Sequence, residues 1–149
     1  MPRILVDADA CPVKEEIYKV AYRRNVPVAI VSNQRIRIPD HPLIERITVS
    51  DAFDAADDWI AEQADARAVV ITGDILLADR CLKKGATVIA PNGKPFTAAS
   101  IGSAIATRAI MADLRVAADG IASGPAPFAK ADRSRFLQAL DEALVRLAK

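Results

Sequence analysis

The stretch RILVDA, residues 3–8, is the part of the sequence that decides the fold. It is a short apolar run without polar alternation, which is typical of a strand covered on both faces, as in a parallel sheet. Two acids, Asp7 and Asp9, stand where this strand should end. Sites in open parallel sheets lie beyond the carboxyl ends of the strands, so this stretch predicts both a fold class and the place of a site.

A helix and a second strand follow directly. Pro12 suits the first position of a helix, and apolar residues recur at helical spacing up to Arg24, after which Asn25 marks the end. Residues 26–32 form the second predicted strand. The start of the chain therefore predicts a strand-helix-strand unit.

The same alternation continues along the chain. Further strands are expected over residues 44–49, 68–72 and 87–90. Between and after them we expect one helix that is capped by Ser50 or Asp51 and runs to about Ala64, a second over 75–84 and a third over 98–116. A last helix at the C-terminal end has an apolar face of Phe136, Leu137, Leu140, Leu144 and Leu147. Residues 33–42 suit an exposed edge or loop, and 119–131 a loop rich in Gly and Pro. These elements predict a three-layer α/β/α fold with a mostly parallel sheet, in one domain over residues 1–149.

The composition limits the classes of function. A chain of 149 residues that is 52% hydrophobic fits one globular domain. Its formal net charge of +1 supplies no global field for a polyanion, so nucleic-acid contacts must come from local patches. We find no signal peptide or membrane span, and two distant cysteines indicate reduced thiols. We therefore expect a cytoplasmic protein without a membrane partner.

The carboxylates are the most informative side chains. The chain has fourteen Asp and only five Glu, and several Asp stand at predicted strand ends. Asp7 and Asp9 after one strand and Asp74 after another could meet across the sheet, and Mg²⁺ prefers such oxygen ligands. Helix capping is the alternative for Asp9 and Asp74. For Asp7 we favour a function, because like charges packed together are costly unless a cation or proton neutralises them.

Two further groups of acids lie on predicted helices. Asp54, Asp57 and Asp58 are three and four residues apart, on one helix face, where the alternative is a solvated acidic surface near the helix N-terminus. Asp79 lies inside the helix after Asp74, and its alternative is an ion pair with a lysine one turn later. We expect the acids to act as a set.

Five sequence motifs together resemble the uncharacterised bacterial YaiI/YqxD family over nearly the full chain. They are DADACPVK (7–14), VSNQ (31–34), DAADDWI (54–60), ITGDILLADRCLKKGA (71–86) and the C-terminal pattern GP.PF…DR..FL.AL. This family is grouped with PIN-like nucleases, which have a doubly wound α/β fold and an acidic metal site. The resemblance thus implies a PIN-like fold.

The resemblance also implies a mechanism. By position, the PIN-like acids correspond to Asp7, to Asp54 or Asp57, and to Asp74 with Asp79 following; Asp57 and Asp58 are not distinguished. We predict catalytic roles for Asp7, Asp57, Asp74 and Asp79, and metal ligation by these together with Asp9, Asp54 and Asp58. The reaction would be hydrolysis of a phosphodiester with Mg²⁺ or Mn²⁺ activating water.

Polar residues near two strand ends are candidates for substrate binding. Asn33 and Gln34 could hydrogen-bond a base or sugar, and Arg35 and Arg37 could contact phosphates. Thr72, at the end of the predicted strand before Asp74, belongs with them. We expect single-stranded RNA as the partner and leave a homo-oligomer open.

Two other functions remain open. A phosphatase of the haloacid dehalogenase type would use Asp7 as nucleophile, Asp9 as acid, Ser32 and the Gly73-Asp74 pair. No lysine lies between Ser32 and Asp74 for the usual stabilising role, and the acids of residues 54–58 would have no task. The third alternative is a domain without catalysis that binds nucleic acid or protein.

Overall fold

A six-stranded sheet forms the centre of the molecule. The computed structural model describes residues 2–8, 11–50, 55–102 and 130–148. The strands are β1 (Arg3–Asp7), β2 (Val28–Ser32), β3 (Ile44–Thr48), β4 (Ala68–Ile71), β5 (Thr87–Ile89) and β6 (Pro95–Phe96), in the order β3-β2-β1-β4-β5-β6. All neighbours are parallel except β5 and β6. The predicted mostly parallel sheet is confirmed.

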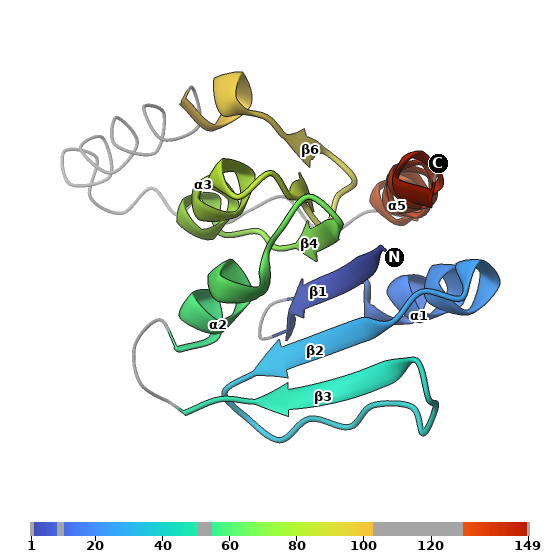
Figure 1. The fold of residues 1–149 in the computed structure, drawn as a ribbon. Helices are drawn as coiled ribbons and strands as arrows, with labels where there is room; N and C mark the ends of the chain where they lie inside the picture. The colour runs from blue at the N-terminus through green and yellow to red at the C-terminus, as the bar shows by residue number, and fades with distance from the viewer. Residues whose placement is uncertain (1, 9–10, 51–54, 103–129, 149) are drawn as a thin grey trace, which may run out of the picture.

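Helices cover both faces of this sheet, which completes the predicted three layers. They are α1 (Lys14–Arg24), α2 (Ala55–Gln63), α3 (Ile75–Lys83) and α5 (Lys130–Ala148). Figure 1 shows α1 and α5 on one side of the sheet and α2 and α3 on the other. None of the helices in the described part of the chain combines the length and apolar character needed to span a membrane.

Strand β1 contributes side chains to the hydrophobic core on each face of the sheet, as its unbroken apolar sequence predicts. Ile4 and Val6 pack with α1 and α5, whereas Leu5 faces α2 and α3. Alternate residues of a strand point to opposite faces, so a central strand covered on both sides must be apolar throughout. The side chains of these three residues are at most 2% exposed.

Local signals end the helices where the sequence predicts. Asn25 adopts a left-handed conformation with φ of 56° and closes α1, and Gly85, with φ of 86°, follows the last turn of α3. Such values suit Asn and Gly best, because a larger side chain is strained there. At these two residues the chain leaves the helix and turns toward the next strand, β2 after Asn25 and β5 after Gly85.

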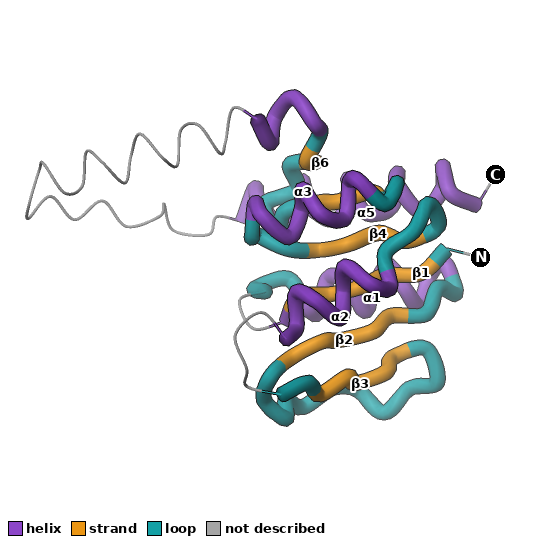
Figure 2. Tube along the Cα trace, turned by 60° about the vertical axis from the view of Figure 1, so that its left-hand side comes forward, coloured by secondary structure: helices purple, strands orange, loops and turns teal. Residues whose placement is uncertain are grey.

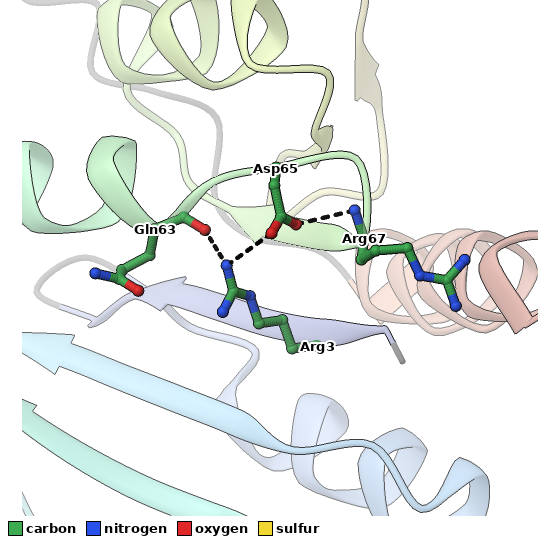
Figure 3. Close-up of polar contacts among 4 residues, drawn as sticks. All are labelled: Arg3, Gln63, Asp65 and Arg67. Carbon is green, nitrogen blue, oxygen red and sulfur yellow. Dashed lines mark hydrogen bonds and ion pairs between the residues drawn. The ribbon is translucent and has the colours of Figure 1, made fainter.

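The amino edge of the sheet is fastened by Arg3. Its guanidinium donates through Nη2 to the backbone carbonyl of Gln63 and to Asp65 Oδ2, the latter at 3.1 Å (Figure 3). Asp65 Oδ1 in turn accepts from the backbone N–H of Arg67 at 2.9 Å. These bonds join the start of β1 to the end of α2 and leave the carboxyl edge for the site.

Some boundaries differ from the prediction. Helix α1 begins at Lys14 rather than Pro12, and α5 begins at Lys130, inside the predicted loop 119–131. The antiparallel β6 was not predicted, because two residues carry no readable periodicity. The predicted cap at Asp51 and most of the helix 98–116 lie outside the described residues; residues 98–102 are helical.

Candidate active site

The hydroxyl of Thr72 joins the ends of two neighbouring strands. β1 and β4 pair in parallel with Val6 opposite Ile71, so the next residues, Asp7 and Thr72, leave the sheet side by side. Thr72 Oγ1 donates to Asp7 Oδ2 at 3.0 Å. The same oxygen accepts from the backbone N–H of Asp74 at 3.0 Å. Thr72 therefore links the carboxylate of Asp7 to the backbone of Asp74.

Asp74 also caps helix α3. Its Oδ1 accepts from the backbone N–H groups of Leu76 at 2.9 Å and Leu77 at 3.4 Å. The capping alternative is thus confirmed for this residue, and the positive end of the helix dipole favours its charge. Oδ2 takes part in neither bond. A cap does not exclude a second role, since both capping bonds are made to Oδ1.

The end of β2 brings the predicted substrate-binding residues to the same edge of the sheet. Ser32 is buried, and its Oγ accepts from the backbone N–H of Gln34 at 3.0 Å, which turns the chain out of the strand. Asn33 and Gln34 are exposed. Further on, Ile36 and Ile38 pack against the core, and the alternating Arg35 and Arg37 are exposed.

Two of the helical acids have basic neighbours. Asp58 Oδ1 meets Arg80 Nη1 at 3.0 Å, which links α2 to α3, and Asp79 Oδ2 meets Lys83 Nζ at 3.0 Å. The ion-pair alternative for Asp79 is therefore present in the structure. The partner of Asp58 was not foreseen, because residues 58 and 80 come together only through the packing of the two helices.

Asp57 faces the seam between α2 and α3. It is half-buried and close enough to Cys81 to influence that thiol. Burial is the main cause that raises the pKa of Cys81 to about 11; the charge of Asp57 contributes in the same direction, and Arg80 and Lys84 oppose it. Asp57 is thus less exposed than Asp58.

The donor set suits a hard cation, although the described residues supply only part of a complete site. Carboxylate oxygens are the ligands that Mg²⁺ and Mn²⁺ prefer. Within residues 2–8, 11–50, 55–102 and 130–148, no three acidic, His or Cys side chains come close enough together to hold a metal ion. The predicted ligands Asp9 and Asp54 lie outside this part of the chain. Among the described residues, Asp7 and Asp74 are therefore two candidate ligands at adjoining strand ends.

Sequence reasoning missed how the chain beyond β1 is anchored. Lys14 Nζ donates to the carbonyl of Cys11 at 3.1 Å, and Arg133 Nη1 donates to the carbonyl of Pro12 at 3.0 Å. Lys14 stands within the DADACPVK motif, which offered one signal. Arg133 comes from the other end of the chain, so only the fold reveals its role.

Known proteins similar to this chain belong to one family. The model of the family described as "Uncharacterized BCR, YaiI/YqxD family" matches residues 5–146. This chain belongs to the YaiI/YqxD family. Within it, a UPF0178 protein of Sphingopyxis alaskensis is 71% identical over 148 residues, covering 99% of this chain and 96% of that protein.

More distant YaiI/YqxD relatives match over a similar length. A UPF0178 protein of Rhodopseudomonas palustris strain TIE-1 is 56% identical over 149 residues, 100% of this chain and 94% of its own. One from Nitrobacter winogradskyi is 57% identical over 147 residues, 99% and 93% of the two chains. No solved structure matches the chain. The names of these relatives state no activity, so the function has to be argued from the site.

Proposed function

We propose that this member of the YaiI/YqxD family is a cytoplasmic, PIN-like nuclease that hydrolyses phosphodiester bonds of single-stranded RNA with a divalent metal ion. The observation that carries the proposal is the Asp7–Thr72–Asp74 arrangement, in which one buried hydroxyl holds a carboxylate at 3.0 Å and a second acid by its backbone, also at 3.0 Å. Two acids fastened at adjoining strand ends are typical of a site that needs fixed oxygen ligands.

The roles of the acids follow from their contacts. Asp7 and Asp74 would each offer a carboxylate to Mg²⁺ or Mn²⁺, and no third acid, His or Cys of the described residues, Asp57 included, lies close enough to complete a set of three with them. Asp9 and Asp54 are the further proposed ligands, and Asp58 and Asp79, which the sequence also proposed, would have to exchange their ion pairs with Arg80 and Lys83 for the metal. The bound metal would lower the pKa of water and neutralise charge on the leaving oxygen. Thr72 would keep Asp7 in one orientation during this reaction.

The substrate would lie over the end of β2. Asn33 and Gln34 are exposed there and offer amide groups that can pair with bases or sugars, and Arg35 and Arg37 offer charge to phosphates. A chain with a net charge of +1 has to attract RNA by such a local patch. Single strands expose their bases to side chains of this kind, which favours them over duplexes.

Cleavage of end-labelled single-stranded RNA tests the proposal. Wild-type protein and Asp74→Asn are incubated with Mn²⁺ or with a chelator. Asn caps a helix as well as Asp, so this variant keeps α3 while losing a charged ligand. We expect the wild type to cleave the RNA with Mn²⁺ but not with the chelator. In Asp74→Asn the cleavage rate should fall by at least about 100-fold, since even residues that only support a metal ligand contribute 10–100-fold.

Asp40→Asn provides the matched control. It removes an exposed acid that precedes β3, away from the strand ends, and should cut RNA at the wild-type rate. Equal cutting by the wild type and Asp74→Asn would contradict the proposal. Turnover of a small phosphomonoester through Asp7 without any RNA cleavage would favour the phosphatase, and metal binding without turnover would favour a binding domain.

A further inference from the structure

The connection from β2 to β3 crosses back along the sheet without a helix. Parallel neighbours need a crossover, which is usually an α-helix, whereas residues 33–43 of this chain form neither helix nor strand. Figure 1 shows this segment running back along β3 from the end of β2 to the start of β3. The segment takes the place of a helix, because its Ile36, Ile38 and Leu43 pack against the core on the α1 side of the sheet.

Exposure alternates along the segment from Arg35 to Ile38. Ile36 and Ile38 are half-buried against the core, and Arg35 and Arg37, which alternate with them, are exposed. Alternate residues of an extended chain point to opposite sides, so both arginines point away from the core on the same side. Within the described part of the chain, neither guanidinium has a hydrogen bond or an ion pair. Both charges are therefore available to a ligand.

Arg46 holds the backbone between the two arginines. This side chain of β3 is half-buried, and its Nη1 donates to the carbonyl of Ile36 at 3.3 Å. The start of the segment is fixed by Ser32, whose Oγ accepts from the backbone N–H of Gln34 at 3.0 Å. Pro39 restricts the residue before it to extended conformations. The backbone that carries the two arginines is therefore held in place before any ligand binds.

The spacing of Arg35 and Arg37 suits successive phosphates of a single strand. Two residues of an extended chain cover about 6.6 Å. The same number of backbone bonds separates successive phosphorus atoms in a nucleic acid, so an extended strand can place neighbouring phosphates at a similar distance. A guanidinium group binds phosphate through two parallel hydrogen bonds, which favours arginine for such a contact.

We propose that Arg35 and Arg37 form a preorganised contact for two successive phosphates of an extended single strand of RNA, and that Arg46 is the positioning residue that holds the backbone between them. This inference rests on the proposed function, because it concerns the substrate of the same site. It specifies how many phosphates the segment binds and that they are neighbours. From this contact the strand continues toward Asn33 and Gln34, which follow the end of β2 at the carboxyl edge.

The salt dependence of RNA binding tests the contact, because each phosphate contact adds about 0.7 to the slope of log affinity against log salt for a single strand. Binding of a labelled single-stranded oligouridine to the full chain is measured with a chelator, so that the RNA is not cleaved. Arg35→Gln and Arg37→Gln should each lower the magnitude of the slope by about 0.7, and the double variant by about 1.4. Arg67→Gln is the matched control: it removes an exposed arginine at the amino edge (Figure 3) and should leave the slope unchanged.

Arg46→Met separates positioning from charge. This variant keeps both phosphate contacts, so the slope should stay at the wild-type value. Its affinity should fall about 2- to 10-fold, because the released segment has to be ordered when RNA binds. Arg46→Lys should recover most of the affinity, since an ammonium group can donate to the carbonyl of Ile36. Wild-type affinity in Arg46→Met, or a slope lower by about 0.7, would overturn the positioning role.

Three results would overturn the phosphate contact. They are an unchanged slope in the double variant, the same loss of slope in Arg67→Gln, and a wild type that does not bind the RNA. A parallel incubation with Mn²⁺ separates this failure from that of the proposed function. Cleavage by the wild type with an unchanged slope in the double variant overturns the contact alone, whereas the expected slopes without cleavage overturn the nuclease alone.

Discussion

Thr72 has a hydroxyl that serves two neighbours and a side chain that is only 1% exposed. It donates to Asp7 and accepts from the backbone of Asp74, both at 3.0 Å. Valine has almost the same shape but neither donates nor accepts. A buried group that loses its partner costs about 1–3 kcal/mol, far more than the bond contributes when it is made.

We therefore predict that Thr72→Val lowers the free energy of unfolding by about 1–3 kcal/mol and weakens Mn²⁺ binding. Thr72→Ser keeps the hydroxyl and loses one methyl group, so it should cost about 1 kcal/mol and leave Mn²⁺ affinity near that of the wild type. Urea unfolding and calorimetry measure the two effects. Equal Mn²⁺ affinity in both variants would show that Thr72 has no part in the site.

Part of this residue-scale picture could be predicted from the sequence. The strand-end positions of Asp7 and Asp74 predicted that both lie at one edge of the sheet, because parallel strands end at one edge. The contact of Arg133 with Glu16 could not be predicted, since these residues are 117 positions apart and only the docking of α5 on α1 brings them together. Nor could the partner of Asp58, which depends on how α2 packs on α3.

At the scale of elements, the turn before β6 is fitted closely to α5. Gly93 has φ of 89°, and a Cβ placed there would lie 2.6 Å from both the carbonyl carbon of Arg135 and the nitrogen of Phe136. These are backbone atoms of a helix and cannot move aside singly. The turn at residues 91–93 is thus also a contact surface for the last helix.

We predict that Gly93→Ala destabilises the protein by about 2–3 kcal/mol, because it combines overpacking with an unfavourable φ. Gly102→Ala is the control, since Gly102 is helical and nothing lies within 4 Å of its added Cβ. It should be neutral or stabilising by up to about 1 kcal/mol. The melting temperatures of the two variants, measured by thermal unfolding, test this prediction. Similar values would contradict the close packing of the turn on α5.

The ion pair between Arg24 of α1 and Asp141 of α5 makes a pH-dependent contribution to stability. The hydrogen bond from Arg24 holds the pKa of Asp141 below its ordinary value. A depressed pKa in the folded state means that the contribution is present above the unfolded pKa of about 3.9 and is lost as the pH falls through the folded value. Asp141→Asn should therefore be less stable than the wild type at pH 7, and the difference should shrink below about pH 4.

Urea midpoints of wild type and Asp141→Asn at pH 7 and pH 3 test this expectation. The pair is largely exposed, with side chains 39% and 26% accessible, so the difference at pH 7 should be small. It should also decrease in concentrated salt. If the difference in stability between the two proteins is larger at pH 3 than at pH 7, a group other than Asp141 determines the pH dependence.

At the scale of the whole molecule, the carboxyl edge of the sheet holds Asp7, Thr72 and Asp74. Strands β1 to β5 are parallel and therefore end at one edge of the sheet, and Figure 2 shows β3, β2, β1 and β4 one above another. Acids therefore meet helix N-termini there, and the opposite edge is closed by Arg3 and Asp65. The alternation of strands and helices predicted this arrangement, because right-handed parallel crossovers leave little other choice.

What the sequence could not predict at this scale is the antiparallel end of the sheet and the reach of α5. β6 has two residues, too few for a periodic signal, and it pairs with β5 only because the turn at 91–93 reverses the chain. α5 spans 19 residues and packs against α1 and β5. Its amphipathic pattern predicted a buried face but not the neighbour that covers it.

Mn²⁺ titration by calorimetry on the wild type and Asp7→Asn tests the central claim most directly. Asn at position 7 can still accept the hydrogen bond from Thr72, so the fold should persist, as a thermal unfolding curve will verify. We predict one or two bound Mn²⁺ ions in the wild type and affinity at least about 10-fold weaker in Asp7→Asn. Equal affinity in the two folded proteins, or no binding by the wild type, would contradict the metal site.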